Sequence, residues 1–362
     1  MPTACIRQPN CSIHLKSERL EVRGILEDTG TEGLLREIPI RDVDRLIIDE
    51  SVHITSAALA ALLRAEIPIN ILAWSGNFLG GFLPATNAHG LARLRQYERT
   101  RDPAFTLQMS GRIITAKLYN QRRVLQRLMA ARSDSGTPMP KAASSKDERS
   151  QPLGPVSETG APVADALGWL NGLFASINAS RSIDELRGYE GASTARYFQA
   201  WGSFLPAAFP FERRSTRPPL NPVNACISFG ATFLYQEMVS CIHSHGLDPS
   251  LGLLHSTEDG RWSLALDLIE PFRPALVEAL TLDLFSRQML GADSFEPRNG
   301  GIYLNDAGRK KFILQYERRM ERQFMSEGAG HRTCLRQQLE NQAILLKAAL
   351  EDPSKFEPFI MN

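Results

Sequence analysis

Three side chains that could take part in catalysis lie within one short stretch of the sequence, between Gly252 and Pro274. His255 precedes a turn, and the apolar segment that follows the turn carries Asp267 and Glu270. The spacing of the leucines predicts a helix over 263–272, and two carboxylates three residues apart lie on one face of a helix. A buried carboxylate pair is costly unless a cation, such as a metal ion or an arginine, lies between the two groups. We therefore interpret this stretch as a candidate metal site.

A second candidate is Glu190, which lies inside a predicted helix that begins at an S-x-x-E capping box formed by Ser182 and Glu185. Glycines flank the glutamate at Gly188 and Gly191. A glycine inside a helix costs about 1 kcal/mol relative to alanine, so something should require these two. Close approach of another backbone or of a ligand to the turn that carries Glu190 would be such a requirement.

The helix after His255 should break at Pro271, because the residue before a proline is pushed away from the helical conformation. Pro274 is well placed for the first turn of a continuation. Mixed imidazole and carboxylate ligands suit Mg²⁺ or Mn²⁺, or else zinc. Because basic helices lie in the same half of the chain, the expected chemistry is at a phosphodiester, where a metal ion would activate the attacking oxygen.

Composition sets only loose limits on function. The chain has 362 residues, 43% apolar and 22% charged, with a net charge of +1, so it suggests two domains and any nucleic-acid footprint must be local. Five scattered cysteines without a CxxC pair argue against a disulfide framework and fit a reducing cytoplasm. We find no uninterrupted apolar span of membrane-crossing length and expect a soluble, cytoplasmic protein without a membrane partner.

The N-terminal part is predicted to be β-rich, with short alternating segments at 13–15, 20–22, 35–40 and 45–48. A short helix over 56–67, with Ser56 as its N-cap, interrupts them. Another apolar run over 69–74 follows, and the sequence SGNFLGGFLP is predicted to close the region as a glycine-rich hairpin. We interpret this region as a scaffold or an oligomer interface.

The remainder of the chain has helical periodicity. A long helix is predicted over 104–132. Its polar side is interpreted as a solvated face and includes Arg112, Lys117, Asn120, Gln121, Arg122 and Arg123. Another helix should begin with Asn221 as N-cap, and a hairpin should turn at Asn299 and Gly300. Residues 133–163, rich in serine, proline and glycine, are expected to be a flexible insertion.

Several motifs in this order resemble those of the CRISPR-associated integrase family, the catalytic subunit of the complex that acquires CRISPR spacers. The most specific are LRGYEGASTARYF, PPLNPVNACISFGATFLY, GLLHS, SLALDLIEPFRP and GGIYLNDAGRKKF. The resemblance implies a two-domain α+β protein. A small β-rich, sandwich-like domain with one short helix, residues 1–90, would form a homodimer, and an all-helical catalytic domain, residues 91–362, would follow it.

The resemblance also implies a site and a reaction. The metal ligands would be Glu190, His255 and Glu270, for Mg²⁺ or Mn²⁺, with Asp267 as a supporting acid. The reaction would be attack of protospacer 3′-hydroxyl ends on phosphodiesters of the CRISPR repeat. The expected partners are protospacer and repeat DNA and a small ferredoxin-like adaptation subunit. Four residues are candidates for DNA-backbone or active-site support: Asn224, Arg309, Lys310 and Lys311.

Three other functions remain open at this stage. One is a metal-dependent nuclease that acts on branched DNA in repair, and another is a non-catalytic DNA-binding scaffold whose carboxylates are only structural. A metal hydrolase for small molecules ranks last, because the sequence contains no HExxH helix or comparable local signature.

Overall fold

The computed structural model describes residues 3–6, 8–26, 30–73, 78–85, 89–134, 162–326 and 330–362. Most of the predicted insertion, 133–163, lies outside the described residues. The chain forms two compact units, which are described separately. The first comprises Met1–Ile113, Phe229–Glu270 and Glu317–Phe359, and the second comprises Ile114–Ser228, Pro271–Tyr316 and Ile360–Asn362.

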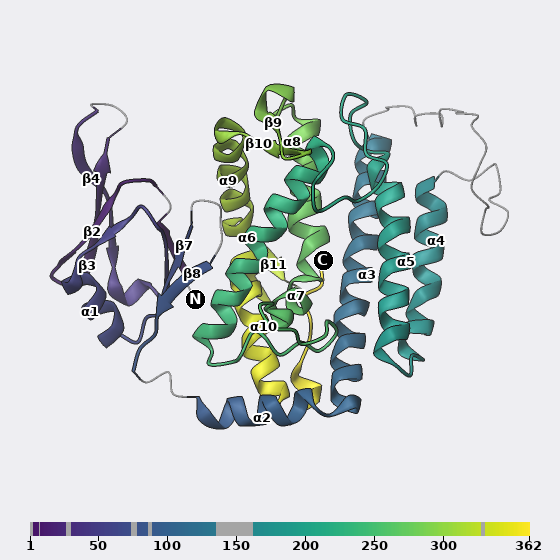
Figure 1. Cartoon of the computed structure of the whole chain (residues 1–362), viewed down its shortest axis with the longest axis horizontal. Helices are drawn as coiled ribbons and strands as arrows, with labels where there is room; N and C mark the ends of the chain where they lie inside the picture. The colour runs from purple at the N-terminus through teal and green to yellow at the C-terminus, as the bar shows by residue number, and fades with distance from the viewer. Residues whose placement is uncertain are drawn as a thin grey trace. The chain divides into compact units, whose positions relative to one another are not determined.

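The N-terminal part of the first unit contains two four-stranded sheets (Figure 1). In spatial order, one sheet consists of β1 (Thr3–Ile6), β5 (Arg45–Asp49), β7 (Ile69–Leu72) and β8 (Phe78–Phe82). The other consists of β4 (Glu32–Pro39), β3 (Arg19–Ile25), β2 (Ser12–Lys16) and β6 (His53–Ile54). The pairs β1–β5, β5–β7 and β2–β6 are parallel and the other pairs are antiparallel. A strand-rich N-terminal region is thus confirmed.

Apolar side chains from both sheets share one core. Ile13 and Leu20 from one sheet and Leu46 and Ile69 from the other are fully buried in it. Helix α1 (Ser56–Arg64) contributes Ala58 and Leu62 to the same core. The predicted N-cap of this helix was wrong by one residue: the hydroxyl of Thr55 accepts a hydrogen bond from the backbone N–H of Ala58 at 3.3 Å.

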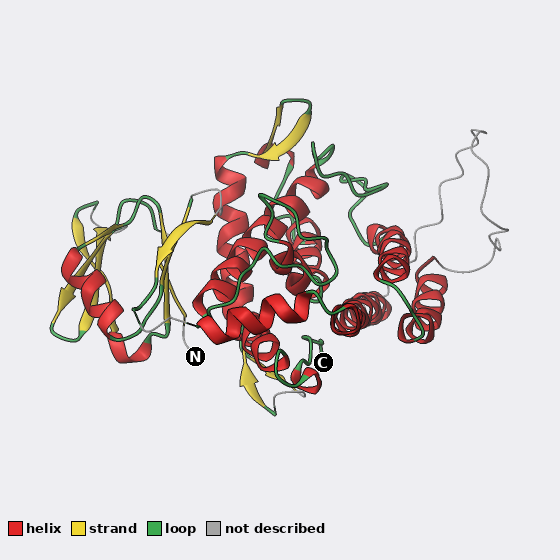
Figure 2. Cartoon of the chain, turned by 60° about the horizontal axis from the view of Figure 1, so that its bottom comes forward, coloured by secondary structure: helices red, strands yellow, loops and turns green. Residues whose placement is uncertain are grey.

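Helices dominate the rest of the chain (Figure 2). They are α2 (Gly90–Thr100), α3 (Pro103–Asp134), α4 (Pro162–Asn178), α5 (Ile183–Gly202), α6 (Pro222–Ser244), α7 (Ser263–Ile269), α8 (Ala279–Ser286), α9 (Asp306–Glu321) and α10 (Leu335–Ala349). A π-helical turn, η2 (Pro274–Glu278), leads into α8. In the second unit, α4 and α5 lie side by side with the C-terminal part of α3 in both views (Figures 1 and 2).

The prediction that residues 91–362 are all-helical was wrong in part, because this region also contains two β-hairpins. One pairs β9 (Phe295–Arg298) with β10 (Gly301–Leu304), and its turn at Asn299 and Gly300 was predicted. Both turn residues have positive φ, 47° and 74°, which Asn and Gly adopt most readily. The other pairs β11 (Phe324–Ser326) with β12 (His331–Thr333), strands of three residues each that are too short for a periodic pattern.

Two predicted helix starts are confirmed. The hydroxyl of Ser182 accepts a hydrogen bond from the N–H of Glu185 at 3.2 Å at the start of α5. The side chain of Asn221 accepts one from the N–H of Asn224 at 2.8 Å at the start of α6. Both caps satisfy a backbone donor that the helix leaves without an internal partner.

Helix α6 qualifies the expectation that no apolar span is long enough to cross a membrane. Among the described residues it is the one helix that meets this test by length and composition, with a mean hydropathy of 1.2 over its best window. However, 67% of that window is buried inside the protein. Buried core helices pass the same test, so α6 is weak evidence for a membrane span.

Candidate active site

The carboxylate of Asp267 is the organising centre of the first half of the site. This residue lies on α7 and has no solvent exposure. Its oxygens accept hydrogen bonds from the backbone N–H groups of Leu253, Leu254 and His255, at 2.6, 3.1 and 3.0 Å. A fourth contact joins Asp267 Oδ1 to the ring Nδ1 of His255 at 2.6 Å. The histidine loop is therefore built around a buried acid on the following helix.

This arrangement fixes the orientation of the His255 imidazole. Because Nδ1 is engaged by a carboxylate, Nε2 is the ring nitrogen that would bind a ligand. Histidines that bind metals almost always hold a carboxylate, a carbonyl or a water with their other ring nitrogen, and that contact sets the tautomer and the direction of the ring. Asp267 has the position and hydrogen bonding of such a supporting group.

The sequence around His255 allows the loop to turn tightly. A Cβ atom on Gly252 would overlap the carbonyl oxygen of His255, so only glycine fits there. At the other end, the backbone N–H of Trp262 donates to the hydroxyl of Tyr235 at 3.1 Å, just before α7 begins. The loop is thus held at both ends and along its middle.

Glu270 lies at the predicted break after α7. The helix ends at Ile269, Glu270 is 4% exposed, and helical structure resumes at Phe272, two residues before Pro274 opens η2. An interruption and a restart are present, but Glu270 keeps helical angles (φ −53°, ψ −43°), so the prediction that Pro271 pushes it out of the helical conformation was wrong. In the second unit, the side-chain amide of Asn120 donates to the carbonyl of Pro271 at 2.6 Å, immediately after Glu270. This bond gives a carbonyl at the interruption a side-chain partner.

Glu190, in the second unit, is neutralised by a residue from a different helix. Its Oε1 forms an ion pair with the ammonium of Lys117 on α3 and accepts a hydrogen bond from the hydroxyl of Thr194 at 3.0 Å. The side chain of Lys117 is only 2% exposed, whereas that of Glu190 is 28% exposed. A buried ammonium thus holds a carboxylate that is partly accessible to solvent.

The prediction of a solvated polar face on α3 was wrong. Lys117, Asn120 and Gln121 are all buried. Asn120 binds the Pro271 carbonyl and also accepts a hydrogen bond from the N–H of Met361 at 2.7 Å, so two distant segments meet on it. Helical periodicity places polar residues on one face, but it does not tell whether that face meets water or other polar groups.

The glycines beside Glu190 do not serve a close backbone approach. Within the described residues, no heavy atom outside the local helix lies within 4 Å of a Cβ built on Gly188 or Gly191. The approach of a ligand to this turn stays a prediction.

The residues predicted to support DNA binding have different environments. Asn224 is buried, and its side-chain oxygen accepts hydrogen bonds from Arg214 and from the N–H of Ser215 at 2.8 and 2.9 Å. On α9, Lys310 and Lys311 are exposed. Arg309 is partly buried and lies 3.3 Å from Asp306.

As chemical types, the predicted ligand residues suit a hard divalent cation. Carboxylate oxygens and one imidazole nitrogen suit Mg²⁺ or Mn²⁺, and the Asp267–His255 contact is the outer support that such a ligand requires. Glu190 belongs to the second unit, and His255 and Glu270 belong to the first. Across the part of the chain that the structure describes, no group of three or more His, Cys, Asp or Glu side chains forms a cluster that could hold a metal.

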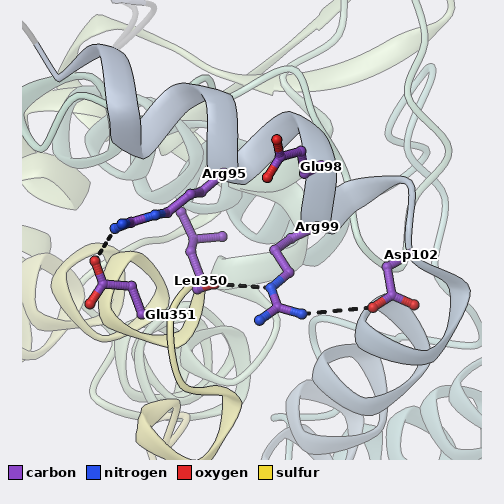
Figure 3. A pocket seen from close by; sticks show the side chains of 6 residues that line it. All are labelled: Arg95, Glu98, Arg99, Asp102, Leu350 and Glu351. Carbon is purple, nitrogen blue, oxygen red and sulfur yellow. Dashed lines mark hydrogen bonds and ion pairs between the residues drawn. The ribbon is translucent and has the colours of Figure 1, made fainter.

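A surface cavity in the first unit is lined by residues at α2 and at the end of α10, none of which is a predicted site residue (Figure 3). Arg95 on α2 pairs with Glu351, and Arg99 donates to the carbonyl of Leu350 at 2.9 Å and lies 3.8 Å from Asp102. These contacts tie α2 to the end of α10 and satisfy a carbonyl there. We therefore interpret the cavity as part of the packing interface between α2 and the end of α10, and not as a ligand site.

Comparisons with known proteins give a consistent result. The chain matches the family model described as CRISPR associated protein Cas1 over residues 4–318. It is 30% identical over 351 residues to a CRISPR-associated exonuclease Cas4/endonuclease Cas1 fusion of Geobacter sulfurreducens, a match that covers 95% of this chain and 56% of the fusion. The chain thus spans a little over half the length of that relative.

A second relative is the CRISPR-associated endonuclease Cas1 of Haloferax volcanii, 28% identical over 316 residues, with 86% of both chains covered. Among solved structures, a chain described as a partial Cas6-RT-Cas1–Cas2 complex superposes with a TM-score of 0.75 and 23% identity, covering 100% of both chains. The structural likeness shows a shared fold.

Proposed function

Because the chain belongs to the Cas1 family of CRISPR-associated proteins, we propose that it is a metal-dependent DNA endonuclease and integrase of CRISPR adaptation. Curated relatives such as the Haloferax volcanii protein are named as CRISPR-associated endonucleases. The observation that carries the proposal is the His255–Asp267 contact at 2.6 Å, because it prepares an imidazole for a ligand within a segment that also holds Glu270.

The proposed metal ligands are Glu190, His255 and Glu270, for Mg²⁺ or Mn²⁺. When bound, the ion would supply Lewis-acid stabilisation of charge at the phosphate. Asp267 orients the imidazole of His255 through Nδ1. Lys117 holds the carboxylate of Glu190 in place through their ion pair. Arg309, Lys310 and Lys311 would contact the DNA backbone, and Asn224 would support the site through its own loop.

The proposed reaction is a transesterification. The 3′-hydroxyl oxygen of a protospacer end attacks a phosphorus of the CRISPR repeat, and the bond from that phosphorus to the repeat's own 3′ oxygen breaks. One phosphodiester forms as another is lost, and the proton of the attacking hydroxyl is balanced by the new 3′-hydroxyl. No oxidant or nucleotide cofactor is needed.

The proposed organisation follows the same family. Residues 1–90 would form the dimerisation domain and residues 91–362 the catalytic domain, in a cytoplasmic homodimer. A small ferredoxin-like subunit would be the protein partner. One structural relative is described as belonging to an assembly that contains Cas2, which supports a partner of this kind.

The test is a strand-transfer assay on supercoiled plasmid that carries a CRISPR repeat. Labelled short duplexes with free 3′-hydroxyls are supplied with Mg²⁺, Mn²⁺ or EDTA, with and without the small subunit. Wild type is compared with Glu190→Gln and with a control on the same helix, Asp184→Asn, whose side chain is 90% exposed. We expect metal-dependent joining by wild type and the control, and loss of joining to the EDTA level in Glu190→Gln.

The other outcomes select among the alternatives. Nicking without joining, even with the small subunit, would favour a nuclease for branched DNA. Binding of DNA without any metal-dependent product would favour the non-catalytic scaffold. Wild-type activity in Glu190→Gln would remove Glu190 from the ligand set.

A further inference from the structure

The loop between α5 and α6 contains three arginines that have no acidic partner in the part of the chain that the structure describes. Residues 203–221 include Arg213, Arg214 and Arg217 and a single acid, Glu212. Within the described residues, none of these three guanidinium groups forms an ion pair with a carboxylate. By contrast, a single buried arginine of the first unit, Arg336, contacts three carboxylates: Glu237, Glu317 and Glu321.

The backbone of this loop is held in one conformation by Asn224. Its side-chain oxygen accepts from the N–H of Ser215 at 2.9 Å, and its amide nitrogen donates to the carbonyl of Arg213 at 3.0 Å. The hydroxyl of Ser215 in turn accepts from the N–H of Leu220 at 2.9 Å. Both flanks of Arg214 and the return of the loop to α6 are therefore fixed.

The start of the loop is anchored by an aromatic cluster. The ring of Phe211 lies 5.5 Å from that of Trp201 at an interplanar angle of 81°, and 5.5 Å from that of Phe198. Both partners are buried residues of α5. Edge-to-face and tilted ring contacts of this kind add stability beyond the buried area. Phe211 therefore fixes the backbone that immediately precedes the arginines.

Arg214 is a partly buried cation with only neutral hydrogen-bond partners. Its Nη1 donates to the side-chain oxygen of Asn224 at 2.8 Å, and its Nη2 donates to the hydroxyl of Ser228 at 2.9 Å. Its Nε is buried without a hydrogen-bond partner. Burial, followed by the charge of Arg273, lowers the pKa of Arg214 to about 10, while Glu278 acts in the opposite direction. The group stays protonated at neutral pH and lies in a positive environment.

A rigid loop with three guanidinium groups that have no carboxylate partner among the described residues is suited to an anion with several oxygens. A charge removed from water is stabilised by a counter-charge, and the planar fork of arginine matches the oxygens of a phosphate. Most protein contacts to DNA go to phosphate and sugar, and arginine is a principal donor. Arg213 and Arg217 are exposed, so they can reach such a ligand.

We propose that residues 211–221 form a phosphodiester-binding loop for the backbone of the DNA substrate. Arg213 and Arg217 contact phosphates directly, Arg214 supplies a fixed positive charge behind them, and Asn224 is a positioning residue that acts through the loop. The proposal rests on the proposed function, because the ligand is DNA.

The experiment measures binding of a labelled short duplex with 3′ single-stranded ends, in EDTA, over a series of salt concentrations. It compares wild type with Arg213→Gln/Arg217→Gln. The control is Arg101→Gln/Arg181→Gln, which removes the same charge from two other exposed arginines. Each lost phosphate contact should lower the slope of log Kobs against log salt by about 0.9, so the loop variant should lose about 1.8. The control should keep the wild-type slope.

A further variant separates position from charge. Asn224→Ala keeps all three arginines but releases the loop, so we expect weaker binding with a wild-type salt slope. Equal slopes for the loop variant and wild type would overturn the proposal and leave an acidic protein surface as the better ligand. Equal decreases in slope for the loop variant and the control would also overturn the proposal. The decrease would then result from the lower net charge of the protein and not from the position of the arginines.

Failure of this inference can be distinguished from failure of the proposed function. If wild type binds no DNA, the proposed function itself fails. If wild type binds and joins DNA while the loop variant keeps the wild-type slope, only this inference fails. EDTA removes the chemistry from the measurement, so the ligand assignment of Glu190 does not affect the result.

Discussion

Asp267 and Glu190 are two carboxylates of the candidate site that are stabilised in different ways. Asp267 is fully buried and is surrounded by three backbone N–H groups and one imidazole, all from residues 12 to 14 positions earlier in the chain. Glu190 is partly exposed and is held by the ammonium of Lys117, 73 residues away, and by one hydroxyl.

The difference indicates different roles. A carboxylate saturated by hydrogen bonds from its own loop cannot give them up without loss of the loop, so Asp267 serves to build and orient. A carboxylate neutralised by one cation can exchange that cation for another, which fits the proposed role of Glu190 as a direct metal ligand. The predictions below test this contrast.

The largest effect is expected at Asp267. Replacement by alanine leaves three buried N–H groups without their acceptor and should lower the free energy of unfolding by roughly 3–5 kcal/mol. Asp267→Asn keeps one acceptor oxygen, so it should fold more stably but lose about 10- to 100-fold in strand-transfer activity, the usual cost of removing an outer support of a metal ligand. Urea unfolding and the strand-transfer assay measure the two effects.

The control for Asp267 is Asp259→Ala, an exposed acid of the same segment. It should leave stability and activity close to wild type. If Asp267→Asn kept full activity, the carboxylate would be a structural group only, and His255 would not depend on it for its orientation.

Much of the Asp267 half could be predicted from the sequence, because its contacts are local. One stretch of the sequence shows most of its features. His255 and Glu270 are close in sequence, a proline follows Glu270, and Asp267 lies three residues before Glu270. The hydrogen bonds to Leu253 and Leu254 were not predicted, since they depend on the path of the loop backbone.

The Glu190 half was only partly predictable. The glutamate and its flanking glycines are visible, but Lys117 lies on another helix and its polar neighbours gave the pattern of a solvated face. Likewise, the strands of the N-terminal region were predicted from alternation, whereas β11 and β12 were missed because three residues carry no period. Local signals were detectable, and pairings between distant segments were not.

A smaller effect is expected at Lys117. Lys117→Met removes the counter-charge of Glu190, whose partial exposure lets water compensate in part. We expect a loss of about 1–3 kcal/mol in the free energy of unfolding at pH 7 without metal. Because Mn²⁺ can replace the missing cation, the ion should raise the melting temperature of Lys117→Met more than that of wild type.

The double variant Lys117→Met/Glu190→Gln provides the control. Removal of both charges should recover much of the stability that either single variant loses, with a coupling energy of about 0.5–3 kcal/mol. The double variant should also lose the extra response to Mn²⁺. If the two single losses simply added, the ion pair would not be what stabilises Glu190.

The smallest effect is expected at Gly191, and its sign distinguishes a structural from a functional glycine. A Cβ at this position meets nothing within 4 Å among the described residues, so Gly191→Ala should stabilise the protein by about 0.5–1 kcal/mol through helix propensity alone. If the glycine is needed because DNA approaches the turn that carries Glu190, the same variant should lose strand-transfer activity.

The matched control is Gly172→Ala on α4, which also has open space at its Cβ. It should gain the same stability at no cost in activity. Equal activity in the two variants would show that DNA does not approach the surface of α5 beside Glu190, and Glu190 would then have to bind its ligand from the side facing Lys117.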